Sequence, residues 1–454
     1  MPKKKTALTI EERLQQALVP AEEQPYEVPE NWAWVRLGDV NKYISKSVNP
    51  ISEPDKIFEL YSVPSMVDNY PEIIAGSDIG SSKQSVCKKD VLLCKINPRI
   101  NRVWKVSQFT DNELIASSEW IVIRNNHIDA NYLMYCFQSK YFREFMLSNV
   151  SGVGGSLMRA QPKYVQTYPI PLPPLSEQQR IVERIEELFA KLDEAKERLQ
   201  EVADSFAVRK AAILHKAFTG ELTKQWRLEN GVSDESWEEK KGEDFFEYVT
   251  SGSRGWAKYY SDKGSIFVRM GNLNHGTIEL DLSDIQYVEL PDQVEGQRSK
   301  LQKNDILISI TADVGMIGLV REDMDAYINQ HVALARPKND LYAEFLAWYF
   351  VSDVGLQQMQ NKQRGATKIG LGLQDIRSII LKIPTLPEQH EIVRLIDELL
   401  AREHKAQQAA EQALASIDLM KKSILARAFR GELGTNKASE ASALELLRQV
   451  LAEN

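Results

Sequence analysis

Two stretches of about fifty residues carry nearly the same sequence, and they constrain the fold of this chain more than any other feature. They run over 173–222 and 384–433, at a constant offset of about 211 positions and with roughly twenty identities. Both end in the same pattern, Ala-Phe-X-Gly-Glu-Leu. A repeat of this length indicates two copies of one structural element.

Each copy predicts one long helix, because apolar residues recur at alternating steps of four and three, which is a heptad seam. About forty helical residues at 1.5 Å each make a rod of roughly 60 Å. The first seam comprises Ile181, Ile185, Leu188, Leu192, Ala195, Leu199, Val202 and Phe206. The second, interrupted only by Glu403, comprises Ile392, Ile396, Leu399, Ala406, Ala410, Ala413, Ile417, Met420 and Ile424.

The ends of both helices carry expected signals. Gly220 and Gly431 follow the last apolar residues, where a left-handed C-cap would lie. Each start is predicted to carry a capping box, in which a hydroxyl and an acid or amide three residues later satisfy free backbone groups. The predicted boxes pair Ser176 with Gln179 and Thr385 with Glu388.

The two helices are predicted to pair with each other. Where the first carries Leu199 and Val202, the second carries Ala410 and Ala413, and large side chains facing small ones allow a close approach. A globular segment of about 160 residues between the copies favours an antiparallel, intramolecular coiled coil. The alternatives are a dimerisation coiled coil and two unrelated helical linkers.

Composition places the chain among globular proteins. Its 454 residues are 43% hydrophobic and 26% charged, which predicts two or three domains. No run approaches the roughly eighteen apolar residues of a membrane span, and no signal peptide follows the N-terminal lysines. Three cysteines without a CxxC pattern predict neither a disulfide framework nor a metal site, and they favour the cytoplasm.

The order of segments predicts two similar globular units, each followed by a long helix. Lys303–Ile308 resembles Lys88–Leu93, and Val332–Pro337 resembles the strand predicted within 115–124. Helices are predicted over 129–147 and 341–360, each followed by a glycine-rich loop. The predicted segments are an N-terminal arm 1–29, a first globular unit 30–172, a central helix 173–222, a linker 223–237, a second globular unit 238–383, a distal helix 384–433 and a C-terminal tail helix 434–454. The fold class is therefore α+β: two similar α/β units, an antiparallel coiled coil and an internal pseudo-twofold repeat.

The chain resembles the specificity subunits of type I restriction–modification systems. The resemblance covers nearly the whole chain. It is carried by the segments 172–178 and 383–389 that open the helices, by 217–222 and 428–433 that close them, by Trp34–Asp39 and by Asn329–Leu334.

The resemblance implies two target-recognition domains that read a bipartite, asymmetric double-stranded DNA site. It implies partners as well: two modification (methyltransferase) subunits and restriction/translocase subunits. S-adenosylmethionine would belong to the methyltransferase, and ATP and Mg to the restriction subunit, with no cofactor in this chain. The helices would set the spacing between half-sites, so a heptad insertion in each should widen the preferred gap and leave the half-sites unchanged.

The residues themselves predict no catalytic activity. Asn49-Pro50 and Asn97-Pro98 lack the rest of an adenine-methyltransferase motif, and no GxxxxGK[ST] phosphate loop occurs. The six histidines form no HExxH, and His331 is expected to be packed or to lie on the DNA side rather than to bind a metal. The net charge of −8 argues against non-specific coating of DNA, so any contact must be local or supported by a partner.

Base reading needs Arg, Lys, Asn, Gln or Ser side chains on loops, with further cations at phosphates. In the first unit the candidates are Asn97, Arg99, Asn101, Arg102, Ser156, Arg159 and Lys163. In the second they are Ser251, Ser253, Arg254, Lys258, Tyr259, Arg269, Asn272, Asn274, Lys362, Arg364, Thr367 and Lys368. For each, a solvated surface position is the alternative. For the whole chain, the alternative from another class is a coiled-coil scaffold that never reads DNA, and a modification system without a restriction partner is a third possibility.

Overall fold

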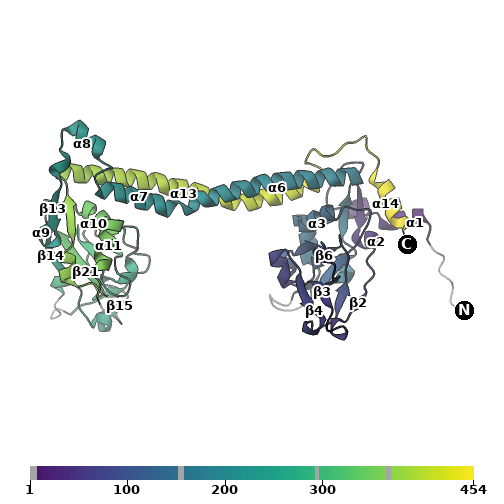
Figure 1. Ribbon diagram of the computed structural model, residues 1–454, viewed down its shortest axis with the longest axis horizontal. Helices are drawn as coiled ribbons and strands as arrows, with labels where there is room; N and C mark the ends of the chain where they lie inside the picture. Colours follow the sequence, from purple (N-terminus) through teal and green to yellow (C-terminus); the bar gives the residue numbers. More distant parts are fainter. Residues whose placement is uncertain (1–7, 152–157, 292–295, 365–369, 454) are drawn as a thin grey trace. The chain divides into compact units, whose positions relative to one another are not determined.

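The chain forms two compact units, and each of the repeated helical stretches is divided between them. The computed structural model describes residues 8–151, 158–291, 296–364 and 370–453. The first unit comprises Met1–Arg198 and Ala413–Asn454, and the second comprises Leu199–Gln412 (Figure 1). Each unit therefore contains the start of one repeated copy and the end of the other.

The long helices are where the repeat predicts them, with one difference. The second copy is one continuous helix, α13, over Leu386–Ala428. The first is divided at Ser205 into α6, Leu175–Asp204, and α7, Phe206–Phe218. Gly220 and Gly431 adopt φ values of +79° and +75°, so the left-handed helix ends are confirmed.

Contacts within each unit confirm the antiparallel pairing. In the first unit Lys421 Nζ lies 2.5 Å from Asp193 Oδ1, and Ile181 shares a core with Phe429. In the second unit Arg209 pairs with Glu403 at 2.8 Å. Farther along, Arg227 pairs with Glu388 at 2.7 Å. Residue numbers rise along one partner as they fall along the other.

The predicted seam is correct at its ends and wrong at three positions. Val202 and Met420 are 44% and 50% exposed, and Ala406 is also exposed. A strict heptad drifts around a helix of 3.6 residues per turn, and the break at Ser205 shifts the phase further. The fully buried seam positions are Ile181, Ile185, Phe206, Ile392, Ile396, Ala410 and Ile417, and the half-buried ones are Leu188, Leu192, Ala195, Leu199, Leu399, Glu403, Ala413 and Ile424.

Both predicted capping boxes are wrong. Because α6 begins at Leu175, Ser176 lies inside the first turn, where its hydroxyl donates to Glu440 at 3.1 Å. Glu388 is fully buried, and its carboxylate accepts hydrogen bonds from Thr223 and Arg227 instead of closing a box with Thr385. Tertiary contacts thus use the side chain that local rules assign to the helix end.

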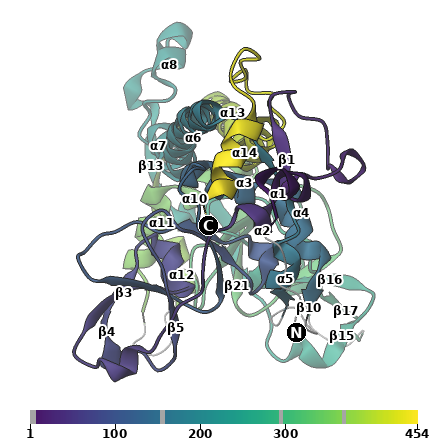
Figure 2. The ribbon, with the colours of Figure 1, turned by 90° about the vertical axis from the view of Figure 1, so that its right-hand side faces the viewer.

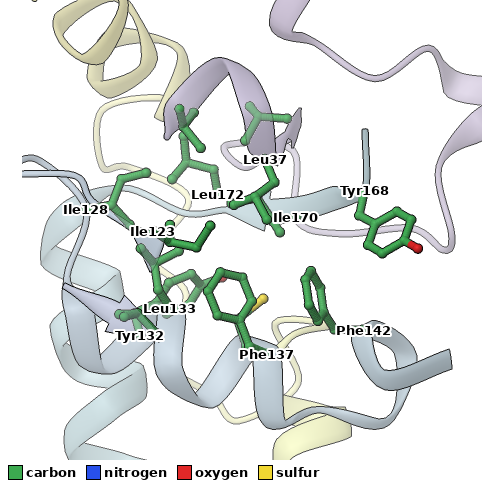
Figure 3. Close-up of a cluster of buried hydrophobic side chains, with 14 of the residues drawn as sticks. Leu37, Ile123, Ile128, Tyr132, Leu133, Phe137, Phe142, Tyr168, Ile170 and Leu172 are labelled. Atoms are coloured by element: carbon green, nitrogen blue, oxygen red, sulfur yellow. The ribbon is translucent and has the colours of Figure 1, made fainter. Parts of the chain in front are cut away.

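The first unit places four sheets, one of them a short strand pair, and a helical pair beneath the end of the coiled coil. Its core lies between the strand pair β1–β12 and helices α3 and α4, where Leu37, Tyr132, Phe137, Phe142 and Ile170 converge (Figure 3). The sheets are β1 (Ala33–Arg36) with β12 (Pro169–Leu172); β2 (Ser47–Val48), β5 (Lys83–Ser85), β8 (Glu113–Ala116), β3 (Ile57–Tyr61) and β4 (Glu72–Ala75) in that order; and β7 (Val103–Lys105), β6 (Val91–Cys94) and β9 (Trp120–Ile123). The helices are α2 (Leu37–Val40), α3 (Ala130–Gln138), α4 (Lys140–Ser148) and α5 (Pro162–Val165), and β10 (Val150–Ser151) pairs with β11 (Arg159–Ala160).

The second unit repeats this order of elements. A strand pair again lies beside the long helix, and a helical pair again follows the central sheet. Its sheets are β13 (Glu238–Lys241) with β22 (Ile380–Ile383); β14 (Phe246–Ser251), β21 (Val332–Pro337), β18 (Ile306–Ser309) and β19 (Ile317–Leu319); and β15 (Tyr260–Ser261), β17 (Tyr287–Val288), β16 (Ser265–Val268) and β20 (Ala326–Ile328). Its helices are α8 (Lys224–Asn230), α9 (Gly242–Phe245), α10 (Ala343–Val351), α11 (Asp353–Asn361) and α12 (Leu373–Arg377).

The predicted correspondence between the units is confirmed. β6 matches β18 and β9 matches β21, and each pair of strands is joined by the same ion pair between a buried aspartate and a half-buried arginine. These pairs are Asp90 with Arg124 at 2.6 Å and Asp305 with Arg336 at 2.7 Å. Two predictions need correction: each helix expected over 129–147 and 341–360 is split at a buried serine, Ser139 or Ser352, and the strand expected within 115–124 is two strands, β8 and β9.

The two terminal helices meet in the first unit. Helix α1 (Ile10–Ala17) has a capping box between Thr9 and Glu12 and packs on α14 (Ala443–Ala452), as Figures 1 and 2 show. The Arg13 guanidinium donates to the Leu451 carbonyl at 3.1 Å. Across the described ranges, every helix is too short or too polar to cross a membrane.

Candidate nucleic-acid interface

A buried glutamate at the start of α6 fixes the first unit's framework. Glu177 is fully buried and accepts hydrogen bonds from Trp32 Nε1 at 2.7 Å and Asn436 Nδ2 at 2.9 Å. Burial raises the pKa of Glu177, and these two donors oppose the rise. Gln178 accepts from the Asp129 amide at 2.8 Å and so fixes the start of α3.

The second unit uses the same two positions with different partners. Glu388 accepts from Thr223 Oγ1 and Arg227 Nη1, both at 2.7 Å. Gln389 accepts from the Tyr342 amide at 3.0 Å, as Gln178 does from Asp129. The Glu-Gln pair repeated in both sequence copies was the available signal for this framework; the capping prediction assigned Glu388 to a helix end instead and did not use Glu177 or Gln178.

In the first unit, polar and basic side chains gather at the turn between β6 and β7. Asn97 begins the turn with φ +47°, and its amide donates to the Met158 carbonyl at 2.9 Å, which brings the turn beside β11. Arg99 is exposed in this turn, and its carbonyl accepts from the Arg143 guanidinium on α4. The fold thus brings distant parts of the chain to one surface.

Arg159 is the predicted candidate held most specifically. Its guanidinium pairs with Glu119 at 3.2 Å, and its side chain is 50% exposed. Lys95 lies close by, with its ammonium donating to the Ser118 carbonyl at 2.6 Å. Lys163 lies over the Tyr164 ring at 4.6 Å on the neighbouring α5. We call Lys95, Arg99, Arg102, Arg143, Arg159 and Lys163 the basic rim. Lys95 and Arg143 were missed because a turn lysine and a helix arginine carry no local signal.

Two predicted readers serve the fold instead. Asn272 is 4% exposed, and its side chain accepts from the Arg269 amide and donates to the carbonyls of Asp281 and Asp284, so its prediction is wrong. Asn101 is half-buried in a left-handed turn at φ +52°, and its amide donates to the Gln138 carbonyl at 3.2 Å. In both residues, hydrogen bonds within the fold already use side-chain amide groups that base reading would need.

In the second unit the corresponding surface lies before β21 and after β18. Ser253 bridges to Asn329 and accepts from the exposed Arg298 at 3.4 Å, while Arg254 beside it is exposed. Thr311, just after β18, bridges to Gly370. Residues from five separate segments of the chain therefore lie at this surface.

The centre of this surface is a chain of three polar side chains that sequence reasoning did not assemble. Thr311 Oγ1 lies 2.6 Å from His331 Nδ1, and His331 Nε2 lies 2.8 Å from Gln330 Nε2. His331 is exposed and Gln330 half-buried. The register of β9 and β21 places Glu119 of the first unit where the second has His331.

The remaining candidates differ in their exposure and in their partners. Arg364 pairs with Asp375 at 2.9 Å and is 82% exposed, Arg269 pairs with Asp284 at 3.1 Å, and Lys258 lies over Tyr259. Ser251 ends β14. Asn274 is exposed and Lys362 half-buried. Ser156, Thr367, Lys368 and most of both glycine-rich loops lie outside the described residues.

Comparison with known proteins identifies the family to which the chain belongs. A family model described as the type I restriction modification DNA specificity domain matches residues 29–204 and 234–412. The chain belongs to this family. The family's domain therefore occurs twice, once in each globular unit with the helix that follows it.

Named members of the family are similar over much of the chain. The specificity subunit of type I restriction enzyme EcoBI from Escherichia coli is 31% identical over 306 residues, which cover 63% of this chain and 64% of that relative, just under two thirds. The EcoKI specificity subunit from Escherichia coli strain K12 is 28% identical over 345 residues, or 72% of each chain. The HsdS subunit structure from Thermoanaerobacter tengcongensis matches the fold with a TM-score of 0.67 at 22% identity, covering 90% of this chain and 99% of its own.

Proposed function

We propose that this chain is the DNA-reading specificity subunit of a type I restriction–modification complex. Each globular unit would bind one half of a split, asymmetric DNA sequence. Two methyltransferase subunits and restriction subunits would dock on it and carry out the chemistry. The chain itself would be non-catalytic, with S-adenosylmethionine held by the methyltransferase and ATP and Mg by the restriction subunit.

One observation carries this proposal: the two units repeat their buried framework but differ on the exposed surface at the same place in the fold. The ion pair between a buried aspartate and a half-buried arginine of neighbouring strands recurs in both. At the position before β9 or β21, however, one unit has the half-buried Glu119 holding the exposed Arg159, and the other has the exposed His331 beside Gln330. Two readers of two different half-sites require such a pattern, whereas a scaffold for identical partners does not.

The charges on these surfaces fit DNA despite the chain's net charge of −8. The basic rim comprises six cations, of which Arg99, Arg159 and Lys163 are exposed and the other three half-buried, with Glu119 as the ion-pair partner of Arg159. Arg254, Arg298 and Arg364 lie exposed around the second surface. Such cations would contact phosphates, while amide and guanidinium groups would contact base edges.

The comparison of the two units also indicates where two copies of one partner subunit would dock. Identical partners need surfaces that both units repeat, and the exposed faces of the long helices provide them. Leu175 and Leu386, at matching helix starts, are both 41% exposed. The first unit also exposes Leu419 and the pair Glu187–Lys191, and the second exposes Val208 and the pair Glu398–Arg402 at the equivalent positions.

The test is a methylome. The chain would be expressed with its neighbouring methyltransferase in a host without adenine methylation, and modified bases would be sequenced. We expect methyladenine at one split motif with a fixed gap. The matched control is the methyltransferase expressed alone, which should leave the motif unmodified.

The alternative outcomes separate the functions. A stable complex that methylates nothing and shows no preference in a pool of DNA duplexes would contradict DNA reading and favour the scaffold. Methylation without cleavage of unmodified DNA in the native host would retain the DNA-reading role and indicate a system without a restriction partner.

A further inference from the structure

We propose that Gln330 reads an adenine in the half-site bound by the second unit, and that His331 and Thr311 are positioning residues that hold its amide. This inference rests on the proposed function and adds the chemistry of one contact. It is carried by the hydrogen-bonded chain Thr311–His331–Gln330 and by its place in the fold.

The chain is mounted on rigid backbone. Gln330 lies two residues before β21, a central strand whose residues from Val332 to Ala335 are fully buried. The His331 amide donates to Asn329 Oδ1 at 3.0 Å, and its carbonyl accepts from the Ile310 amide at 2.9 Å. The Asn329 amide donates to the Val268 carbonyl at 3.0 Å. A side chain held this way keeps its orientation before any ligand binds, which lowers the entropy cost of specific contact.

The hydrogen-bonding groups leave a defined pattern for a ligand. If the Gln330 amide donates one N–H to His331 Nε2, the imidazole carries its proton on Nδ1 and donates to Thr311 Oγ1. Gln330 then retains one N–H and its carbonyl oxygen. If the amide is turned over, its oxygen accepts from Nε2–H and still keeps one lone pair beside its N–H groups.

Both arrangements present a donor next to an acceptor, and adenine matches this pattern. In the major groove adenine offers N7 as an acceptor and the N6 amino group as a donor, and a glutamine amide can bond to both. Guanine presents two acceptors there, one of which would face the Gln330 oxygen. The exposed Arg254, Arg298 and Arg364 on the same surface supply charge for the flanking phosphates.

The experiment compares methylomes of the complete complex carrying single substitutions. Gln330→Ala should reduce discrimination by about tenfold at one adenine of the second half-site and leave the first half-site unchanged. Gln330→Glu should move the preference at that position toward cytosine, because a carboxylate accepts from the cytosine N4 amino group.

Positioning is tested separately. Thr311→Val removes the hydroxyl that holds His331 and should weaken discrimination at the same base without changing which base is preferred. His331→Asn, which can still donate and accept, should retain more discrimination than His331→Ala. The matched control is Gln302→Ala. Gln302 is an exposed glutamine of the same unit, but it lies on the turn before β18, whereas Thr311 lies after β18. This substitution should alter the preference at neither half-site.

The outcomes distinguish this inference from the function on which it rests. If wild-type complex modifies a split motif and both Gln330 variants modify the same motif with the same preference, the assignment of Gln330 is wrong and the DNA-reading role stands. If wild-type complex modifies nothing, the proposed function fails first. Should Gln330→Ala prevent folding, judged by thermal unfolding, the base preferred by Gln330→Glu decides the question, and an unchanged adenine preference overturns the assignment.

Discussion

The two units of this protein show what a duplicated fold keeps and what it changes. Both hold a buried glutamate and glutamine at the start of a long helix, and both pair a buried aspartate with a half-buried arginine between neighbouring strands. Yet the first unit holds Glu177 with neutral donors, Trp32 and Asn436, whereas the second pairs Glu388 with Arg227. The interior therefore preserves the position of a carboxylate and allows its partner to change, because any donor set that satisfies a buried carboxylate maintains the fold.

The exposed surfaces differ more than the interiors. At one position of the fold the first unit presents a guanidinium fixed by a carboxylate, and the second presents an amide beside an imidazole. His331 is exposed and the Arg159 side chain is 50% exposed, so substitutions of these two residues should disturb packing less than substitutions in the core. A comparison of the two units inside one chain thus separates the repeated framework from the surface that differs.

The largest expected effect tests the two buried glutamates against each other. Glu388→Gln leaves the Arg227 guanidinium, which is 8% exposed, with the exposed Asp234 at 2.9 Å as its remaining ion-pair partner among the described residues, and should destabilise the second unit by about 3 kcal/mol. Glu177→Gln removes a charge that has no ion-pair partner among the described residues, and it should cost only about 1 kcal/mol. Chemical denaturation of both variants measures the difference, and equal losses would contradict the contrast.

A somewhat smaller effect is expected at the first half-site. Arg159→Ala removes the guanidinium that Glu119 orients and should cost about 1–3 kcal/mol of discrimination at one base pair. The second half-site should remain unchanged in the methylome. Lys163→Ala, on the same rim, is the control: it should weaken DNA binding uniformly and reduce its salt dependence. Loss of preference in both half-sites would argue against independent reading by the two units.

Partner docking should respond to the repeated leucines. Leu175→Lys or Leu386→Lys places a charge on a surface that would be buried by a methyltransferase subunit, at a cost of about 1–3 kcal/mol in binding. Each single variant should lose one of two bound copies at limiting concentration, and the double variant should lose both. Native mass spectrometry measures the stoichiometry, with Ile44→Lys, an 84% exposed position outside the long helices, as the control. Full occupancy of the double variant would remove these leucines from the docking surface.

The smallest effect is a pH dependence. Burial raises the pKa of Glu177 above its ordinary value, opposed by the donors Trp32 and Asn436, so the folded state binds this proton more tightly than the unfolded chain. The contribution of Glu177 to stability should therefore increase as the pH falls from neutral through the raised pKa. Denaturation of wild type and Glu177→Gln across this window measures it, and a constant difference between the two at every pH would contradict it.

The amino-acid sequence by itself determined the architecture. Two copies of one helical pattern, with glycines at matching ends, specify two long helices, because heptad periodicity and left-handed C-caps are local properties. The correspondence of β6 with β18 and of β9 with β21 also followed from short segments of similar sequence that occur in the same order in the two halves. The family resemblance rested on those same repeated segments, and the family comparison confirms it.

Only the tertiary structure decided which polar residues serve the fold and which lie at the surface. Asn272 and Gln330 are both amides next to strands, yet one satisfies three turn groups inside the unit and the other meets His331 on the surface. Glu388 follows a predicted helix start but binds Arg227, more than 150 positions earlier in the chain. Hydrogen bonds between segments that are distant in sequence depend on how the whole chain folds, and no local pattern of residues encodes which segments come together.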